Sequence, residues 1–285
     1  MSSLMAQYHR ILPLNPHGRD LVVGDIHGAY EKLRMQLLGI GFKSHVDRLL
    51  SVGDLIDRNP DSYQALNWLE QSYFWAVRGN HENMYLNWRY QGDEEYAKEY
   101  LNDINGGSWV QSHPEHFHQS LTESIEELPY LMSVPFLVQG ETKWALLVHA
   151  DFPSSWLIDN EPQVLSRDWL CQPQHELLFE DPDFIDFITW NRKRLLEGRK
   201  PGVDLSQAMF DNIEGYDLVI VGHSTVNTPL RMGHFIYWDA GGWIDQRSFP
   251  IKTLQDLYQH FHQLPEAHLP KESKLQRWKQ FFLKS

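Results

Sequence analysis

Cysteine is nearly absent from this chain: Cys171 is the only one among 285 residues. A single cysteine excludes an internal disulfide framework and favours a reducing compartment, so we expect a cytoplasmic protein. The polar stretch around Cys171 contains no paired motif, which argues against a nucleophilic role. Apolar runs long enough to span a bilayer are also missing, and nothing near Met1 resembles a signal peptide.

Positive charge is in deficit as well. The chain has 25 Lys and Arg against 38 Asp and Glu, which gives a formal net charge of -13. A surface of this sign repels polyanions, so we expect no nucleic-acid partner and no membrane partner. A metal ion with a few arginines can still bind one phosphate group locally. We take a monomer as the expected state.

Five short apolar runs are present, and each one ends in Asp, Asn or His. They cover residues 21–23, 49–52, 74–77, 145–148 and 217–221. The first three alternate with helical patterns at about 29–40 and 60–72, which predicts parallel strands with right-handed crossovers. Ligands of open α/β sheets gather outside the carboxyl ends of the strands. We therefore expect the polar residues after these runs to form one site.

A second, partly antiparallel sheet is expected to pack on the first. Residues 131–138 and 144–148 flank a polar turn, which predicts a β-hairpin. Further strands are expected at 234–239 and about 247–253. The lead-in, residues 1–19, is expected to be a loop with an edge strand.

Helical patterns fill much of what remains. Residues 82–128 are expected to be mostly helical, with their aromatic side chains in the core, and 151–215 to be loop-rich and partly helical. We interpret three histidines in the first of these segments as part of a solvated loop or helix face rather than a metal cluster, because no strand end frames them. These are His113, His116 and His118.

The tail, residues 254–285, carries two helical patterns separated by Pro265 and Pro270. We expect it to be a C-terminal helical appendage docked on a single domain that spans 1–285. A partner-binding helix is the alternative.

Three sequence blocks resemble the signature of the metal-dependent phosphoprotein phosphatases. The blocks are Gly24-Asp25-x-His27-Gly28, Gly53-Asp54-x-x-Asp57-Arg58 and Gly79-Asn80-His81-Glu82. Later pieces are similar to the bacteriophage lambda type of serine/threonine protein phosphatase and its bacterial relatives, namely His149-Ala150-Asp151, Trp190-Asn191-Arg192, Gly222-His223-Ser224 and Asp239-Ala240-Gly241. The resemblance covers about residues 20–253. It implies an α/β calcineurin-like metallophosphoesterase, with a central two-sheet β-sandwich flanked by helices and a dinuclear metal site at the carboxyl ends of the strands.

The chemistry of phosphate ester hydrolysis supports two metal ions at these strand ends. Such a pair lowers the pKa of a water molecule and binds the phosphate oxygens. Asp25 and His27 suit the first ion, and Asp54 suits a bridge because its carboxylate has two oxygens. Three further residues suit the second ion: Asn80, His149 and His223. The mixed oxygen and nitrogen set fits Mn²⁺, Fe or Zn²⁺ better than Ca²⁺ or Mg²⁺, and the resemblance favours Mn²⁺.

By resemblance, Arg58, Arg78 and Arg192 bind the substrate phosphate together with Asn80. Guanidinium groups suit this task because they bind phosphate bidentately. Two alternatives stay open: Arg192 could form surface salt bridges beside Lys193 and Arg194, and Arg78 could be partly structural.

His81 follows Asn80 and is expected to point into the site. A serine leaving group needs a proton, which a histidine can supply, and Asp57 can hold that imidazole by charge and hydrogen bond. Our hypothesis is that Asp57 and His81 form the general-acid pair, as the resemblance also implies. We expect Glu82 to be a structural acceptor for neighbouring N–H groups.

Three functions are compatible with the sequence. The first is hydrolysis of phosphoserine and phosphothreonine in phosphoproteins, with phosphotyrosine left open. The second is symmetrical diadenosine tetraphosphate hydrolysis by a sister group, against which stand Asp57 and Glu82, since the sister pattern has other residues at both positions. The third is a metal-free binding protein with a decayed site, which the complete set of ligand positions disfavours.

Overall fold

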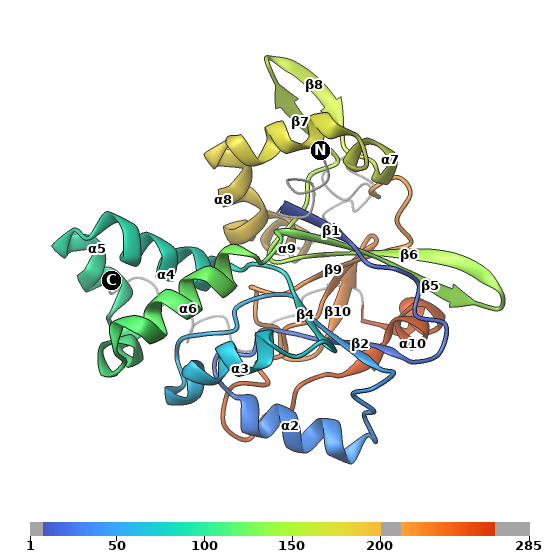
Figure 1. Ribbon diagram of the computed structural model, residues 1–285. Helices are drawn as coiled ribbons and strands as arrows, with labels where there is room; N and C mark the ends of the chain where they lie inside the picture. The colour runs from blue at the N-terminus through green and yellow to red at the C-terminus, as the bar shows by residue number, and fades with distance from the viewer. Residues whose placement is uncertain (1–7, 201–211, 266–285) are drawn as a thin grey trace.

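A four-stranded sheet carries three of the five predicted strands (Figure 1). The computed structural model describes residues 8–200 and 212–265. In this sheet β2 (Asp20–Val23), β3 (Arg48–Ser51) and β4 (Phe74–Ala76) run parallel, as predicted from the alternation with helices. A short strand, β12 (Lys252–Thr253), pairs antiparallel with β2 and is all that forms of the strand expected at 247–253.

A six-stranded mixed sheet packs against the first. Its order is β1 (His9–Ile11), β5 (Leu131–Val138), β6 (Glu141–Val148), β9 (Leu218–Val221), β11 (Phe235–Tyr237) and β10 (Leu230–Met232). The hairpin of β5 and β6 and the edge strand β1 are confirmed. The sequence did not predict β10.

The side-chain alternation of the strands builds three core layers. In β2, Val22 faces the second sheet, where it joins Leu50 and Leu147, while Leu21 and Val23 face the helices. Val219 of β9 faces the opposite outer layer. The sandwich predicted from the resemblance is therefore confirmed, with helices on both outer faces.

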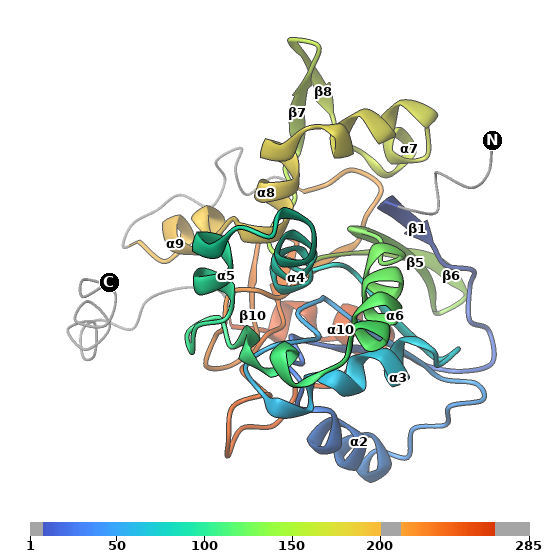
Figure 2. The ribbon, with the colours of Figure 1, turned by 60° about the vertical axis from the view of Figure 1, so that its left-hand side comes forward.

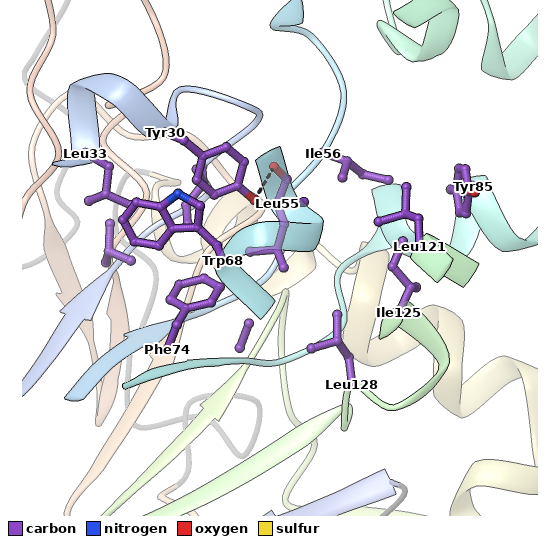
Figure 3. Close-up of a cluster of buried hydrophobic side chains, with 14 of the residues drawn as sticks. Tyr30, Leu33, Leu55, Ile56, Trp68, Phe74, Tyr85, Leu121, Ile125 and Leu128 are labelled. Carbon is purple, nitrogen blue, oxygen red and sulfur yellow. Dashed lines mark hydrogen bonds between the residues drawn. The ribbon is translucent and has the colours of Figure 1, made fainter. Parts of the chain in front are cut away.

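Helices cover the outer face of the four-stranded sheet. They are α2 (Tyr30–Gly39), η1 (Pro60–Gln64), α3 (Ala65–Leu69), α4 (Asn80–Gln91), α5 (Glu94–Tyr100), η2 (Gly107–Ser112) and α6 (Glu115–Glu126). Figure 3 shows the core beneath them, where Tyr30 packs near Trp68 and its hydroxyl donates to the carbonyl oxygen of Leu55 at 3.1 Å. The helix expected at 60–72 forms as a 3-10 turn followed by α3.

The solvated position expected for the histidine cluster is wrong for His118. Its side chain is buried, and the hydroxyl of Tyr85 lies 3.1 Å from its Nδ1 atom. The α6 helix turns His118 towards α4 together with Leu121 and Ile125, so helical periodicity rather than polarity decides where it lies.

The opposite outer face is covered by residues 151–198. They form β7 (Ser155–Ile158), β8 (Glu161–Val164), α7 (Arg167–Leu170), η3 (Pro173–Glu180), α8 (Pro182–Trp190) and α9 (Lys193–Gly198). The β7–β8 hairpin was not predicted, and it projects from the body in both Figure 1 and Figure 2. Asp181 caps α8 by accepting from the backbone N–H of Asp183.

The described part of the tail consists of α10 (Leu254–Gln259) and η5 (Phe261–Gln263), whose Leu254, Leu257 and Phe261 pack between the sheets' edges. The second predicted tail helix lies in 266–285, outside the described residues. Within 8–200 and 212–265, no helix combines the length and apolarity that a bilayer crossing requires.

Candidate metal centre

His27 and Asp54 face each other at the ends of β2 and β3. Nδ1 of His27 lies 2.9 Å from the carbonyl oxygen of Ile56 and donates to it, so we assign the lone pair to Nε2. That Nε2 lies 3.5 Å from Oδ2 of Asp54. Both residues have positive φ, 44° for His27 and 49° for Asp54, a strained conformation that functional sites retain.

Asp54 also reaches the ends of the strands in the second sheet. Its Oδ1 lies 3.2 Å from Nε2 of His149, whose Nδ1 lies 2.7 Å from the carbonyl oxygen of Val52. Oδ1 of Asn80 lies 2.9 Å from Nε2 of His149 and 2.9 Å from Nδ1 of His223. The structure therefore brings together Asp54 and the three residues expected to hold the second ion.

Two groups of possible ligand atoms share Asp54. One contains His27, Asp54 and His81, the other Asp54, His149 and His223, and in each group the atoms lie within 4.8 Å of one another. The shared carboxylate is placed to bridge two cations.

The donor set around His149 fits a metal ion. Because Nδ1 of His149 donates to Val52, its Nε2 lone pair faces the oxygens of Asp54 and Asn80, and electron pairs on all three atoms converge. Only a proton or a cation can occupy such a point. Burial lowers the pKa of His149, but the charge of Asp54 overrides it and raises that pKa to about 9. A metal ion would take the place of this proton.

The buried carboxylates of Asp25 and Asp54 also favour a positive charge beside them. Burial, followed by the charges of Asp239 and Asp54, raises the pKa of Asp25 well above its usual value. Burial also opposes ionisation of Asp54, yet its histidine neighbours, His149 first, hold its pKa well below the usual range. Asp25 is fixed by the backbone N–H of His223, which lies 3.1 Å from both of its oxygens. Asp25 belongs to neither group of donor atoms, and the group around His27 contains His81 and Asp54.

Glu82 organises the backbone around these ligands. Its carboxylate accepts from the backbone N–H groups of Gly79 at 2.8 Å, Asp54 at 3.0 Å and Leu55 at 2.8 Å. Glu82 lies in the first turn of α4 and accepts from the N–H of the N-cap residue Gly79, so one side chain fixes both the start of α4 and the end of β3. The expected structural role of Glu82 is confirmed. Gly79 leaves room for this, because a Cβ atom there would lie 2.3 Å from Oδ1 of Asp54.

Asp57 and His81 are paired within the buried part of the site. Nδ1 of His81 lies 2.7 Å from Oδ2 of Asp57. We assign the Nδ1 proton to this bond, which directs Nε2 towards Asp54, at 4.0 Å from Oδ2 of that residue. Nη2 of Arg58 lies 3.2 Å from the same Nε2.

The three predicted phosphate-binding arginines lie in different surroundings. Arg58 is exposed beside His81, with its guanidinium 4.7 Å from the centroid of the Trp243 ring. Arg78 is buried, and its Nη atoms donate to the carbonyl oxygen of Glu126 and the hydroxyl of Tyr130, so the partly structural alternative is confirmed.

Arg192 lies close enough to the site to feel its carboxylates. Arg192 is exposed to solvent. Partial desolvation lowers its pKa, and the negative charges of Asp25 and Asp54 oppose that shift. Arg194 turns away, because it pairs with the buried Asp151 at 2.8 Å. Arg194 therefore does not compete with Arg192 for a position at the site.

Sequence reasoning missed three aromatic residues at the site. The ring of Trp243 meets that of His27 edge-on, with 4.9 Å between centroids, and Tyr100 and Trp109 both donate to Asp57. Trp243 follows the strand end at Asp239 by four residues, which is a signal of the kind that found the other residues. Tyr100 and Trp109 had no such signal, since they lie in the helical segment assigned to the core.

Comparison with known families gives one match that covers most of the chain. The model of the calcineurin-like phosphoesterases matches residues 19–227. Two solved structures share the fold at low sequence identity. A putative diadenosine tetraphosphatase superposes with a TM-score of 0.50 and 17% identity, covering 87% of this chain and 98% of that one. A protein serine/threonine phosphatase from Saccharomyces cerevisiae gives 0.51 and 16%, covering 93% and 86%.

Curated relatives are more similar in sequence. Serine/threonine-protein phosphatase 2 of Salmonella typhimurium is 30% identical over 225 residues, which is 78% of this chain and 87% of the relative. Serine/threonine-protein phosphatase 2 of Escherichia coli is 36% identical over 220 residues, 77% of this chain and 86% of the relative. A symmetrical bis(5'-nucleosyl)-tetraphosphatase of Coxiella burnetii is 32% identical over only 138 residues, 48% of this chain and 43% of the relative.

Proposed function

The chain belongs to the calcineurin-like phosphoesterase family, and from this premise we propose that it removes phosphate from phosphoserine and phosphothreonine in proteins. It is a metal-dependent hydrolase, and the relatives that it matches over most of its length are serine/threonine-protein phosphatases. We further propose phosphotyrosine as a secondary substrate, Mn²⁺ as the metal, and a monomer working in the cytosol.

The observation that carries this proposal is the pairing of His81 with Asp57 beside Asp54. A seryl alkoxide is a poor leaving group and needs a proton as the P–O bond breaks. Nε2 of His81 faces the Asp54 side of the site, and Asp57 holds the ring by accepting from its Nδ1 atom. A nucleotide phosphate leaves more easily and needs less acid help, so the pair favours monoesters of serine and threonine.

In this proposal Asp25, His27 and Asp54 hold one ion, while Asp54, Asn80, His149 and His223 hold the other. When bound, the two ions supply an activated water and a clamp on the phosphate oxygens. The convergent electron pairs of Asp54, Asn80 and His149 support the second set, and the burial of the Asp25 and Asp54 carboxylates supports a cation near them.

The arginines and Asn80 orient the substrate phosphate. Arg58 and Arg192 present guanidinium groups at the mouth of the site, where bidentate hydrogen bonds align the phosphorus for attack. Arg78 donates from one Nη atom to Glu126 and from the other to Tyr130, which fixes the position of its charge.

The test is a comparison of two substrates with Mn²⁺ present: a phosphoserine peptide and diadenosine tetraphosphate. We expect kcat/KM for phosphate release from the peptide to exceed that for the dinucleotide. Preferred cleavage of the dinucleotide would be consistent with the metal centre but would show that the enzyme hydrolyses dinucleotides instead of phosphoproteins. The similarity to a tetraphosphatase over 138 residues makes this the specific alternative.

A further inference from the structure

We propose that the segment from α5 to η2 is a clamp on Asp57, and that Tyr100 and Trp109 are positioning residues for the proton transfer. The inference rests on the proposed function, because it assumes that His81 donates a proton to the leaving oxygen. It assigns a role to a part of the chain that the sequence placed only in the core.

Both aromatic residues bind the same oxygen of Asp57. The hydroxyl of Tyr100 donates to Oδ1 at 2.9 Å, and Nε1 of Trp109 donates to Oδ1 at 2.7 Å. Oδ2 of the carboxylate remains for Nδ1 of His81, at 2.7 Å. The three donors define the plane of the carboxylate, and with it the direction in which the imidazole must point.

The same segment supports the backbone of the two residues that carry the chemistry. Asp57 and Arg58 have φ of 73° and 67°, in the left-handed region that non-glycine residues usually avoid. The carbonyl oxygen of Gly106 accepts from the backbone N–H of Arg58 at 3.2 Å. Contact is so close that a Cβ atom on Gly106 would lie 2.4 Å from that nitrogen.

The two donors are themselves rigid. The side chain of Tyr100 is completely buried, its ring lies 5.8 Å from that of Trp88, and a Cβ atom on Gly107 would lie 2.7 Å from its Cζ. The ring of Trp109 packs edge-on against Phe117 with 6.2 Å between centroids. Their apolar bodies are fixed in the core, so their polar tips cannot follow a shift of Asp57.

A precise imidazole matters most for a poor leaving group. In the reaction a water oxygen bonds to phosphorus and gives up one proton, and the P–O bond to the seryl oxygen breaks. Its electron pair goes to that oxygen, which takes the proton from Nε2 of His81, and the proton released by the water restores His81 for the next turnover. The products are a serine hydroxyl and inorganic phosphate. A p-nitrophenolate leaves without this proton, so only the phosphoserine reaction depends on the clamp.

The experiment measures kcat and KM of Tyr100→Phe and Trp109→Phe on a phosphoserine peptide and on p-nitrophenyl phosphate, in the metal-loaded enzyme. General acid catalysis contributes about 10²–10⁴-fold, and losing one of two donors forfeits part of it, so we expect kcat on the peptide to fall roughly tenfold. KM for the peptide and kcat for p-nitrophenyl phosphate are expected to stay within about twofold to threefold of wild type.

Tyr85→Phe is the matched control. Tyr85 is also a fully buried tyrosine of this helical region, but its hydroxyl bonds to His118 instead of Asp57. We expect both substrates to be turned over at the wild-type rate. If kcat of Tyr100→Phe and Trp109→Phe falls equally on both substrates, or on neither, the clamp is overturned.

His81→Asn separates this inference from the proposed function. If kcat on the peptide falls selectively in His81→Asn but in neither aromatic variant, the clamp is overturned and the general-acid role of His81 stands. If kcat of His81→Asn falls by no more on the peptide than on p-nitrophenyl phosphate, the general-acid role of His81 is refuted, and with it the proposed function on which the clamp rests. Tyr100→Phe and Trp109→Phe each keep an aromatic ring at the substituted position in the core.

Discussion

The guanidinium of Arg58 lies over the indole ring of Trp243, with 4.7 Å between its Cζ atom and the ring centroid. The loop that carries Trp243 is itself fixed, because Nζ of Lys32 donates to the carbonyl oxygens of Gly242 and Ile244 at 2.8 Å each. A flexible surface arginine is thereby held beside Nε2 of His81, where we propose that it meets the substrate phosphate. The platform reduces the conformational freedom that Arg58 would lose on binding.

Replacing Trp243 by Leu removes this platform. A cation–π contact of this kind is worth about 1 kcal/mol, so we expect KM for a phosphoserine peptide to rise roughly fivefold, with a smaller change in kcat. Steady-state kinetics on the metal-loaded enzyme would measure both constants.

The matched control is Trp75→Leu, which removes the ring under Arg10, at 5.6 Å, in the strand β4. Because Arg10 is not part of the site, we expect no change in KM. An unchanged KM in Trp243→Leu would show that Arg58 does not depend on the indole ring for its position.

The strand ends were predictable because a local pattern determines them. An apolar run followed by Gly-Asp or Asp-x-His indicates both a buried strand and the side chain that it delivers, so the amino-acid order alone points to Asp25, His27 and Asp54. His149 and His223 followed from the same pattern in the second sheet. The resemblance supplied the order of the blocks and the sandwich.

The missed features depend on packing between distant segments. Tyr100 and Trp109 are 43 and 52 residues from Asp57 in the sequence, and their contact exists only after α4, α5 and η2 have packed beside β3. Nothing local in the sequence distinguishes these two from the other aromatic residues of the core. His118 was assigned to solvent because no strand end frames the histidine cluster, but it is buried, since its place on α6 turns it towards the core.

Both groups of possible metal-ligand atoms contain Asp54. We expect Asp54→Asn to bind fewer than two metal ions per chain and to lose on the order of a thousandfold in kcat, because the amide has the shape of the carboxylate without its charge or second acceptor oxygen. Metal analysis of the purified protein, together with the hydrolysis rate at saturating Mn²⁺, checks both.

Asp239→Asn is the control for charge removal near the centre. Asp239 is buried like Asp54, and its charge acts on Asp25, but its oxygens accept from the hydroxyl of Thr225 at 2.6 Å and the backbone N–H of Gly241 at 2.8 Å. We expect this variant to retain two ions. Two ions per chain in Asp54→Asn would refute the bridging role.

A second buried histidine lies far from the metal centre. His9 of β1 donates from Nδ1 to the carbonyl oxygen of Leu170 at 3.2 Å, and its Nε2 accepts from the hydroxyl of Ser133 at 2.7 Å. The hydroxyl of Tyr216 lies against Ser133 in turn. Burial, followed by the charge of His175, lowers the pKa of His9 from 6.5 to about 4. We assign the neutral ring, with Nδ1 donating to Leu170 and Nε2 accepting from Ser133.

The folded protein should therefore lose stability as the pH falls from 6.5 towards 4. In that window the unfolded chain protonates His9 and the folded chain does not, so the unfolded state binds more protons and the free energy of unfolding rises with pH. With these two pKa values the contribution of His9 lost by pH 5 is about 2 kcal/mol. We expect the difference in the free energy of unfolding between wild type and His9→Asn to narrow by that amount between pH 8 and pH 5, as measured by urea unfolding. Taking the difference between the two proteins cancels the contribution of the metal centre, which titrates in both. His116→Asn, at an exposed position of α6, is the control whose difference should stay constant. A constant difference for His9→Asn as well would mean that the ring is protonated in the folded state and that Ser133 turns to accept from it.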